Sequence, residues 1–149
     1  MSAGTRYRID QTPDRLKRCT WVSPDGRVFL ELPHTIPWYY TAAALTLYQG
    51  VEQGMNPDYD FLVKAISSVS DVPGTLIQIQ WPDGRFLSNP GLPVYDFIGV
   101  GLRGWVLENP EILPRGSKVK LQVDNSANGS AVNLDLFFEG VLRIPMVTE

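Results

Sequence analysis

The stretch Thr75–Arg85, TLIQIQWPDGR, contains the two features that decide the fold, an alternating apolar segment and a turn. Ile77, Ile79 and Trp81 point to one side of an extended chain, and the two glutamines between them point to the other. This period of two is that of a β-strand with one buried face. Pro-Asp-Gly follows with turn chemistry, because proline presets φ and glycine accepts a positive φ. The stretch therefore predicts a strand that ends in a hairpin turn.

The tetrapeptide Pro-Asp-Gly-Arg occurs twice, at Pro24–Arg27 and at Pro82–Arg85. Both copies adjoin apolar runs, and Asp-Gly between such runs is a strong hairpin signal. Turn chemistry is a sufficient explanation for both, since the sequences beyond them diverge. We expect a positive φ at Gly26 and at Gly84. The positions interpreted as structural turns are Pro24, Asp25, Gly26, Pro82, Asp83 and Gly84.

Other segments alternate in the same way. Residues 118–125 and 131–144 each place apolar side chains on one face, and residues 59–68 have strand composition. Residues 39–54 are ambiguous, because alanine and leucine also favour a helix, but we favour a strand there. The inward positions predicted in the two clearest segments are Val119, Leu121, Val123, Val132, Leu134, Leu136 and Phe138.

Turn clusters separate these segments about every 8–12 residues, which is typical of a sandwich or barrel. One such cluster is predicted at residues 108–117, ENPEILPRGS. The length of 149 residues suits one domain, and 44% apolar residues exclude a disordered chain. We predict an all-β fold over residues 21–149, a jelly-roll-like antiparallel β-sandwich of about eight strands. No segment resembles a signal peptide or a membrane span, so we expect synthesis in the cytoplasm.

The charge of the chain is uneven. Its net charge is −3, but residues 1–27 carry six basic and three acidic groups, a balance of +3 that leaves −6 for the remainder. Residues 1–20 lack apolar periodicity, and Pro13 prevents a continuous helix there. We predict an extended basic N-terminal arm, residues 1–20, that docks on a neighbouring copy or an acidic partner; a solvated terminus is the alternative. Its predicted interface residues are Arg6, Arg8, Arg15, Lys17 and Arg18.

The chain contains little material for a catalytic or metal site. Cys19 is its only cysteine and His34 its only histidine, which excludes an intrachain disulfide and a four-cysteine zinc site. Neither has a nucleophile elbow beside it, and Asp58 and Asp60 lack the spacing of a calcium loop. We expect a structural or surface histidine, solvated turn carboxylates, no catalytic residue, no metal and no cofactor.

Residues 99–104, GVGLRG, match the glycine pattern of a dinucleotide-binding loop. Such a loop requires a helix after it, and Pro110 and Pro114 prevent a helix of useful length. We therefore expect these glycines to permit a bend, a bulge or the close packing of strands.

The segment Ile36–Tyr40, IPWYY, has three consecutive aromatic residues that cannot all face one core, because neighbours on an extended chain alternate. At least one of Trp38, Tyr39 and Tyr40 is expected to be exposed or covered by a partner. Aromatic side chains are enriched at protein interfaces and can also form platforms for sugars. We interpret the three as assembly residues, with a loop folded over the sheet edge as the alternative.

The segments from Pro57 to Pro145 also resemble a known class of protein. In chain order they are PDYDFLVKAIS, DGRFLSN, FIGVGLRGWVL, ILPRGSKVKLQVDN and VNLDLFFEGVLRIP. This order resembles the jelly-roll decoration or cement proteins on the capsids of tailed bacteriophages. The resemblance implies a non-enzymatic protein of the virion, located on the capsid surface.

The expected partners are then the major capsid protein and sister subunits in a homodimer or homotrimer. Neither membrane binding nor direct nucleic-acid binding is expected. One alternative is a component of the head–tail junction. The other is a carbohydrate-binding or receptor-binding module of a phage tail or fibre, which would use Trp38, Tyr39 or Trp105.

Removal of residues 1–18 is expected to leave a folded monomer with nearly the parent melting temperature. Binding to capsids or sister subunits should weaken and lose salt dependence, because arginine pairs with carboxylates through charge-assisted hydrogen bonds. Thermal melting and co-sedimentation at two salt concentrations measure the two effects. A truncated chain that does not fold would make the arm a structural strand, and one that binds like the parent would remove its assembly role.

Overall fold

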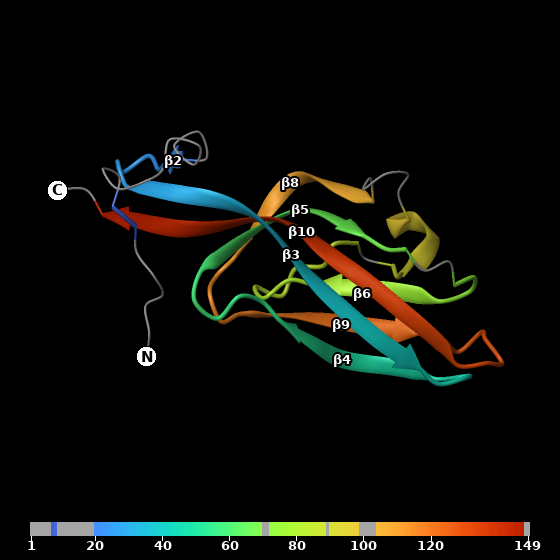
Figure 1. Cartoon of the computed structure of the whole chain (residues 1–149). Coiled ribbons are helices and arrows are strands. Elements are labelled where there is room, and N and C mark those ends of the chain that lie inside the picture. The colour runs from blue at the N-terminus through green and yellow to red at the C-terminus, as the bar shows by residue number, and fades with distance from the viewer. Residues whose placement is uncertain (1–6, 9–19, 70–71, 89, 99–103, 148–149) are drawn as a thin grey trace.

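The computed structural model describes residues 7–8, 20–69, 72–88, 90–98 and 104–147. The protein is all-β, as predicted, and its two sheets form a sandwich (Figure 1). No helix in these residues has the length and hydropathy that crossing a membrane requires. In chain order the elements are β1 (Tyr7–Arg8), β2 (Thr20–Val22), β3 (Val28–Ala42), β4 (Leu47–Gly54), β5 (Asp60–Ser67), β6 (Leu76–Gln80), β7 (Leu92–Pro93), the 3-10 helix η2 (Val94–Phe97), β8 (Trp105–Leu113), β9 (Lys118–Asp124) and β10 (Val132–Val147).

The strand order is that of a jelly roll. Four strands pair antiparallel with four later strands in reverse order: β3 with β10, β4 with β9, β5 with β8, and β6 with β7. The four pairs together correspond to one long hairpin that is folded over into two sheets. As a result β10 also pairs with β5, and β9 also pairs with β6. The first sheet has the order β2-β3-β10-β5-β8, and the second has the order β4-β9-β6-β7. The predicted jelly-roll-like sandwich is therefore confirmed.

The alternating segments supply the core between the sheets. The inward positions predicted in and beside β6, in β9 and in β10 are buried, except for the half-buried Val132. The ambiguous residues 39–54 form no helix, since β3 continues to Ala42 and β4 begins at Leu47. The turn predicted at residues 108–117 is wrong in its first half, because β8 includes everything up to Leu113.

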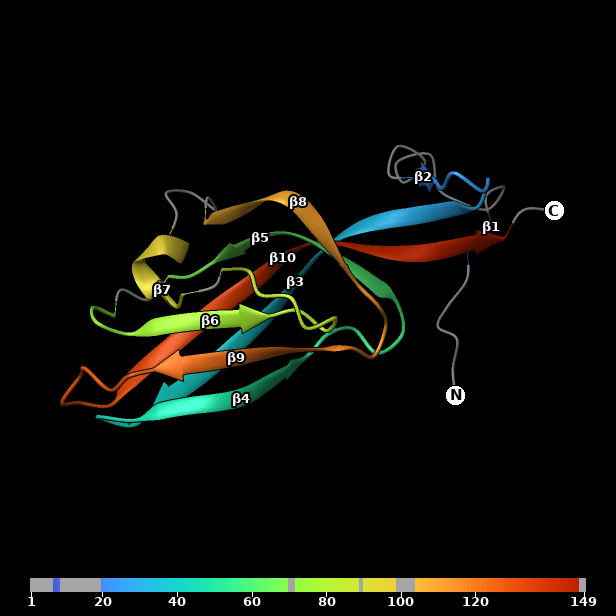
Figure 2. The same cartoon turned by 180° about the vertical axis from the view of Figure 1, so that it is seen from behind.

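The β3–β10 pair is the longest in the molecule. It runs from Val132 opposite Ala42 to Pro145 opposite Phe29 without a register shift. One half lies in the sandwich, and the other projects from it as a ribbon (Figures 1 and 2). At the ribbon, β2 pairs with β3, and β1 pairs in parallel with the end of β10. The N-terminal arm therefore contacts its own chain at Tyr7–Arg8.

Arg143 joins three strands of this ribbon. Its Nε donates a hydrogen bond to Glu31 on β3 at 2.9 Å, and its guanidinium carbon lies 4.0 Å from the centre of the Trp21 ring on β2. Both partners of the ion pair are mostly buried. A guanidinium over an aromatic face is attracted by the ring electrons, and burial strengthens that attraction. The contact fixes β2 against the ribbon.

Gly140 lies where β5 approaches β10 most closely. A Cβ at this position would lie 1.8 Å from the carbonyl oxygen of Leu62, where no methyl group fits. The register of β5 against both neighbours shifts at Lys64, so that Val63 pairs with Gly140 while Ala65 pairs with Glu139. Such a bulge bends a strand and increases its twist. The bend lies near the point where the ribbon leaves the sandwich (Figure 1).

Two edge strands are irregular. In β4 the register shifts between Tyr48 and Val51, and Gly50 adopts a φ of 71°. In β8, residues 107–110 stand opposite Lys64 alone, and this bulge includes Pro110. Proline has no N–H to donate, and a bulge interrupts the ladder that another strand would extend.

Gly140→Ala is expected to destabilise the fold by about 3 kcal/mol or more, because the methyl group must displace backbone atoms of β5. Gly54→Ala is the matched control, since a Cβ there meets nothing within 4 Å and should change stability by no more than about 0.5 kcal/mol. Urea unfolding of both variants measures the difference. Equal stability of the two variants would contradict the close approach.

Candidate functional site

The outer face of the first sheet carries apolar side chains on β3, β10 and the second residue after β5. Tyr39 is 70% exposed, and its ring meets Phe137 edge-on at 6.0 Å. Pro37 stands opposite Phe137, and Val69, which is 79% exposed, donates its N–H to Asp135 opposite Tyr39. We call Pro37, Tyr39, Val69 and Phe137 the Tyr39 patch.

The three aromatic residues of IPWYY have different environments. Trp38 is 3% exposed and stacks on Tyr40 in the core with ring centres 5.5 Å apart. The assembly role expected for Trp38 is therefore wrong, because its side of β3 faces the second sheet. Tyr40 is half-buried against Tyr48. Only Tyr39 is available to a partner, which confirms that at least one of the three is exposed.

The structure describes only part of the interface predicted in the N-terminal arm. Arg6, Arg15, Lys17 and Arg18 lie outside the described residues, and Arg8 is placed only by its backbone pairing with Val147. The assembly role of the arm stays a prediction.

The glycines of residues 99–104 lie outside the described residues apart from Gly104. A Cβ there would lie 2.2 Å from the carbonyl oxygen of Ile66, which confirms the close packing of strands expected at this position. His34, expected to be a structural or surface histidine, is half-buried, and its ring meets Phe61 edge-on at 5.7 Å.

The two Pro-Asp-Gly-Arg turns have the same hydrogen-bond pattern. The residue before proline is Ser23 in the first turn and Trp81 in the second. In each turn its N–H donates to the arginine carbonyl at 2.8 Å, and its own carbonyl accepts a hydrogen bond from the glycine N–H at 2.9 Å. In each, the aspartate accepts hydrogen bonds from the backbone and the Nε of the arginine. Gly26 has a φ of 85° and Gly84 a φ of 93°, as predicted. The repeat is one turn used twice.

The second turn makes a contact that the first does not. Arg85 Nη2 donates to Glu111 on β8 at 2.7 Å, while its Nε donates to Asp83 at 2.7 Å. Hydrogen bonds from Arg85 lower the pKa of the Asp83 carboxyl, and hydrogen bonds to Glu111 and Asp83 raise the pKa of Arg85. Asp83 and Arg85 therefore stay charged at neutral pH. The contact holds the β6–β7 segment against β8 (Figure 2).

A groove of about 700 Å³ lies between residues 81–87, which follow β6, and strand β8. We call it the β8 groove. The β6–β7 segment contributes Arg85 and Phe86, and Phe86 is 47% exposed. A short hairpin positions Phe86, since it bridges to Gln80 and the next N–H donates to Ile79. The side of β8 contributes Trp105, Glu108, Asn109 and Glu111, two of them on the bulge at residues 107–110.

Sequence reasoning missed most of this groove. The sequence indicated Trp105 as a possible sugar-binding residue but gave no indication of Phe86, Glu108 or Asn109. The Arg85–Glu111 pair joins residues 26 positions apart, which no local pattern reveals. Pro110 was the available signal, because a proline within an apolar run indicates an edge strand or a bulge.

Comparisons with protein-family models, curated proteins and solved structures found no match. Among the described residues, no three or more His, Cys, Asp or Glu side chains are grouped so that they could hold a metal ion. A fold alone does not define a function. The Tyr39 patch and the β8 groove are therefore the features from which a function is argued.

Gly84→Val and Gly26→Val are each expected to cost more than about 1 kcal/mol, because a β-branched residue is strained at positive φ. Crowding is not the cause, since a Cβ meets nothing closer than 4.0 Å at either position. Thermal melting measures the loss, with Gly129→Val as the control in open space at an ordinary φ. Unchanged melting of both turn variants would reject the hairpin interpretation and reopen a ligand role for the repeated Asp and Arg.

Proposed function

We propose that the chain is a non-enzymatic structural protein of a tailed-phage virion, which decorates or cements the capsid through contacts between symmetry-related copies. Two observations support this. The jelly-roll order is one that viral capsid proteins use, although lectins and cupins use it as well. The order of strand and turn segments between Pro57 and Pro145 is the sequence pattern from which this class was expected.

The observation that carries the proposal is the Tyr39 patch. An exposed tyrosine with a rigid neighbour is a typical interface anchor, because tyrosine is enriched among the residues that dominate binding energy at interfaces. Tyr39 meets this description, because the long β3–β10 ladder fixes its backbone and Phe137 supports its ring.

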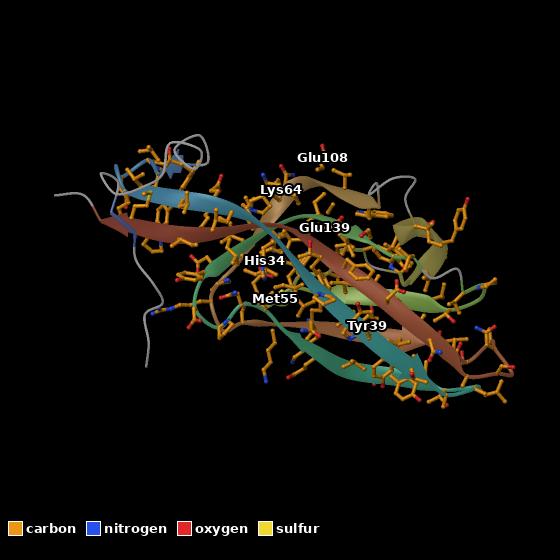
Figure 3. The ribbon with its side chains drawn as sticks, in the orientation of Figure 1. His34, Tyr39, Met55, Lys64, Glu108 and Glu139 are labelled. Carbon is orange, nitrogen blue, oxygen red and sulfur yellow. The ribbon has the colours of Figure 1, made fainter. Side chains whose placement is uncertain are left out.

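Two charged residues lie on the same sheet beyond the apolar patch. Lys64 lies on β5 and Glu139 on β10, away from Tyr39 on β3 (Figure 3). A symmetric interface places the same patch of both copies face to face, so that a lysine of one copy can meet a glutamate of the other. Such rim charges set the register of an interface more than its strength.

The proposed partners are sister subunits, in a dimer or trimer, and the major capsid protein, with the protein on the outer surface of the capsid. The basic arm would contribute a second contact to an acidic neighbour. A position at the head–tail junction uses the same surfaces and is distinguished by imaging of particles.

Tyr39→Arg is expected to turn an oligomer into a monomer, because the substitution places a charge in an apolar contact. Light scattering coupled to size-exclusion chromatography measures the mass of the full chain and of the variant. Tyr95→Arg is the matched control, since Tyr95 is also 70% exposed but lies on η2. The control should keep the mass of the parent.

Two results would contradict the proposal. One is a parent chain that is monomeric at all accessible concentrations. The other is the absence of the protein from purified particles of the encoding phage, tested by immunogold labelling. Labelling of the shell would support decoration, whereas labelling at the neck alone would support the junction.

A further inference from the structure

We propose that the β8 groove is a binding site for a neutral saccharide. The groove is separate from the Tyr39 patch, because none of the four patch residues lines it. The inference therefore does not depend on how the protein assembles. Its volume of about 700 Å³ lies in the range of ligand sites, and it is an open groove rather than an enclosed cavity.

The groove offers apolar surface on which a sugar ring can stack. Phe86 is almost half exposed, and Trp105 on the facing strand is partly exposed. A pyranose presents a face of C–H groups, and an aromatic ring provides a large, rigid surface for such a face. Two aromatic residues from different segments allow contact with successive sugar units.

Polar groups of the kind that recognise hydroxyls line the same groove. Glu108 and Asn109 lie exposed on the β8 bulge, where an acceptor carboxylate and an amide with both donor and acceptor can meet adjacent hydroxyls. Arg85 is held by Asp83 and Glu111, and it retains N–H groups beyond the two that these bonds use. Because its position is fixed before binding, a ligand loses less conformational entropy in using it.

The charge of the groove disfavours an anionic ligand. Arg85 is the one basic group among the lining residues, and Glu108 and Glu111 are acidic, with Asp83 adjacent. A phosphate, a nucleic acid or an acidic sugar would meet net negative charge, which disfavours binding. A polyhydroxylated neutral chain uses the carboxylates as acceptors without this repulsion.

The test is binding of the full chain to an array of neutral, acidic and amino oligosaccharides, followed by titration calorimetry with the best neutral hexasaccharide. Fluorescence provides a second readout, since Trp81 and Trp105 both line the groove. We expect binding by neutral glycans and a change in tryptophan emission. Phe86→Ala should weaken binding about tenfold through loss of stacking, and Asn109→Ala by a similar factor through loss of hydrogen bonds.

Tyr95→Ala is the control, an exposed aromatic residue outside the groove, and should bind like the parent. Tyr39→Arg should also retain sugar binding, which separates this proposal from the assembly proposal. Melting temperatures near that of the parent exclude unfolding as the cause of any loss.

Three results would overturn the proposal. The first is no binding to any neutral glycan at millimolar concentrations. The second is neutral-glycan binding that neither Phe86→Ala nor Asn109→Ala weakens. The third is tighter binding to an oligolysine probe with the same sensitivity to both variants, which would assign the groove to a basic peptide.

Discussion

The unbroken ladder between β3 and β10 is the constraint on which the other features depend. It joins the first and last strands of the jelly roll, so its closure forces the intervening strands to pair in reverse order. Pairing residues so distant in sequence costs loop entropy, and buried side chains such as Trp38 and Phe138 offset that cost. The same register fixes which side of β3 faces the second sheet. Tyr39 is therefore exposed because its neighbour Trp38 stands opposite the buried Leu136.

Sequence patterns predicted those parts of the fold that depend on local geometry. The alternation in β6, β9 and β10 and the two Pro-Asp-Gly-Arg turns are local, since each follows from a few neighbouring residues. The choice between Trp38 and Tyr39 is not local, because a shift of one residue in register exchanges the two faces. The turn predicted at residues 108–113 was wrong for a related reason. Their prolines and acidic groups resemble a turn, and only pairing with β5 keeps them in a strand.

The groove shows how a local motif acquires a role from its surroundings. Both turns position an arginine beside its own aspartate, but only Arg85 meets a carboxylate on another strand, while Arg27 lies 5.6 Å from the ring centre of Phe29. Exposed ion pairs contribute little to stability. The Arg85–Glu111 contact joins two segments that are 26 positions apart in the sequence. The tetrapeptide predicted the turn, whereas its place in the tertiary structure was set by residues far along the chain.

The irregular edges of β4 and β8 bear on the behaviour of the protein at high concentration. Regular, exposed edge strands allow chains to add to one another without limit, and this growth leads to amyloid-like fibres. The kink at Gly50 and the bulge at Pro110 interrupt that route along both strands. Another chain therefore cannot extend either sheet by regular pairing along β4 or β8, and a contact with a second protein must use other parts of the surface.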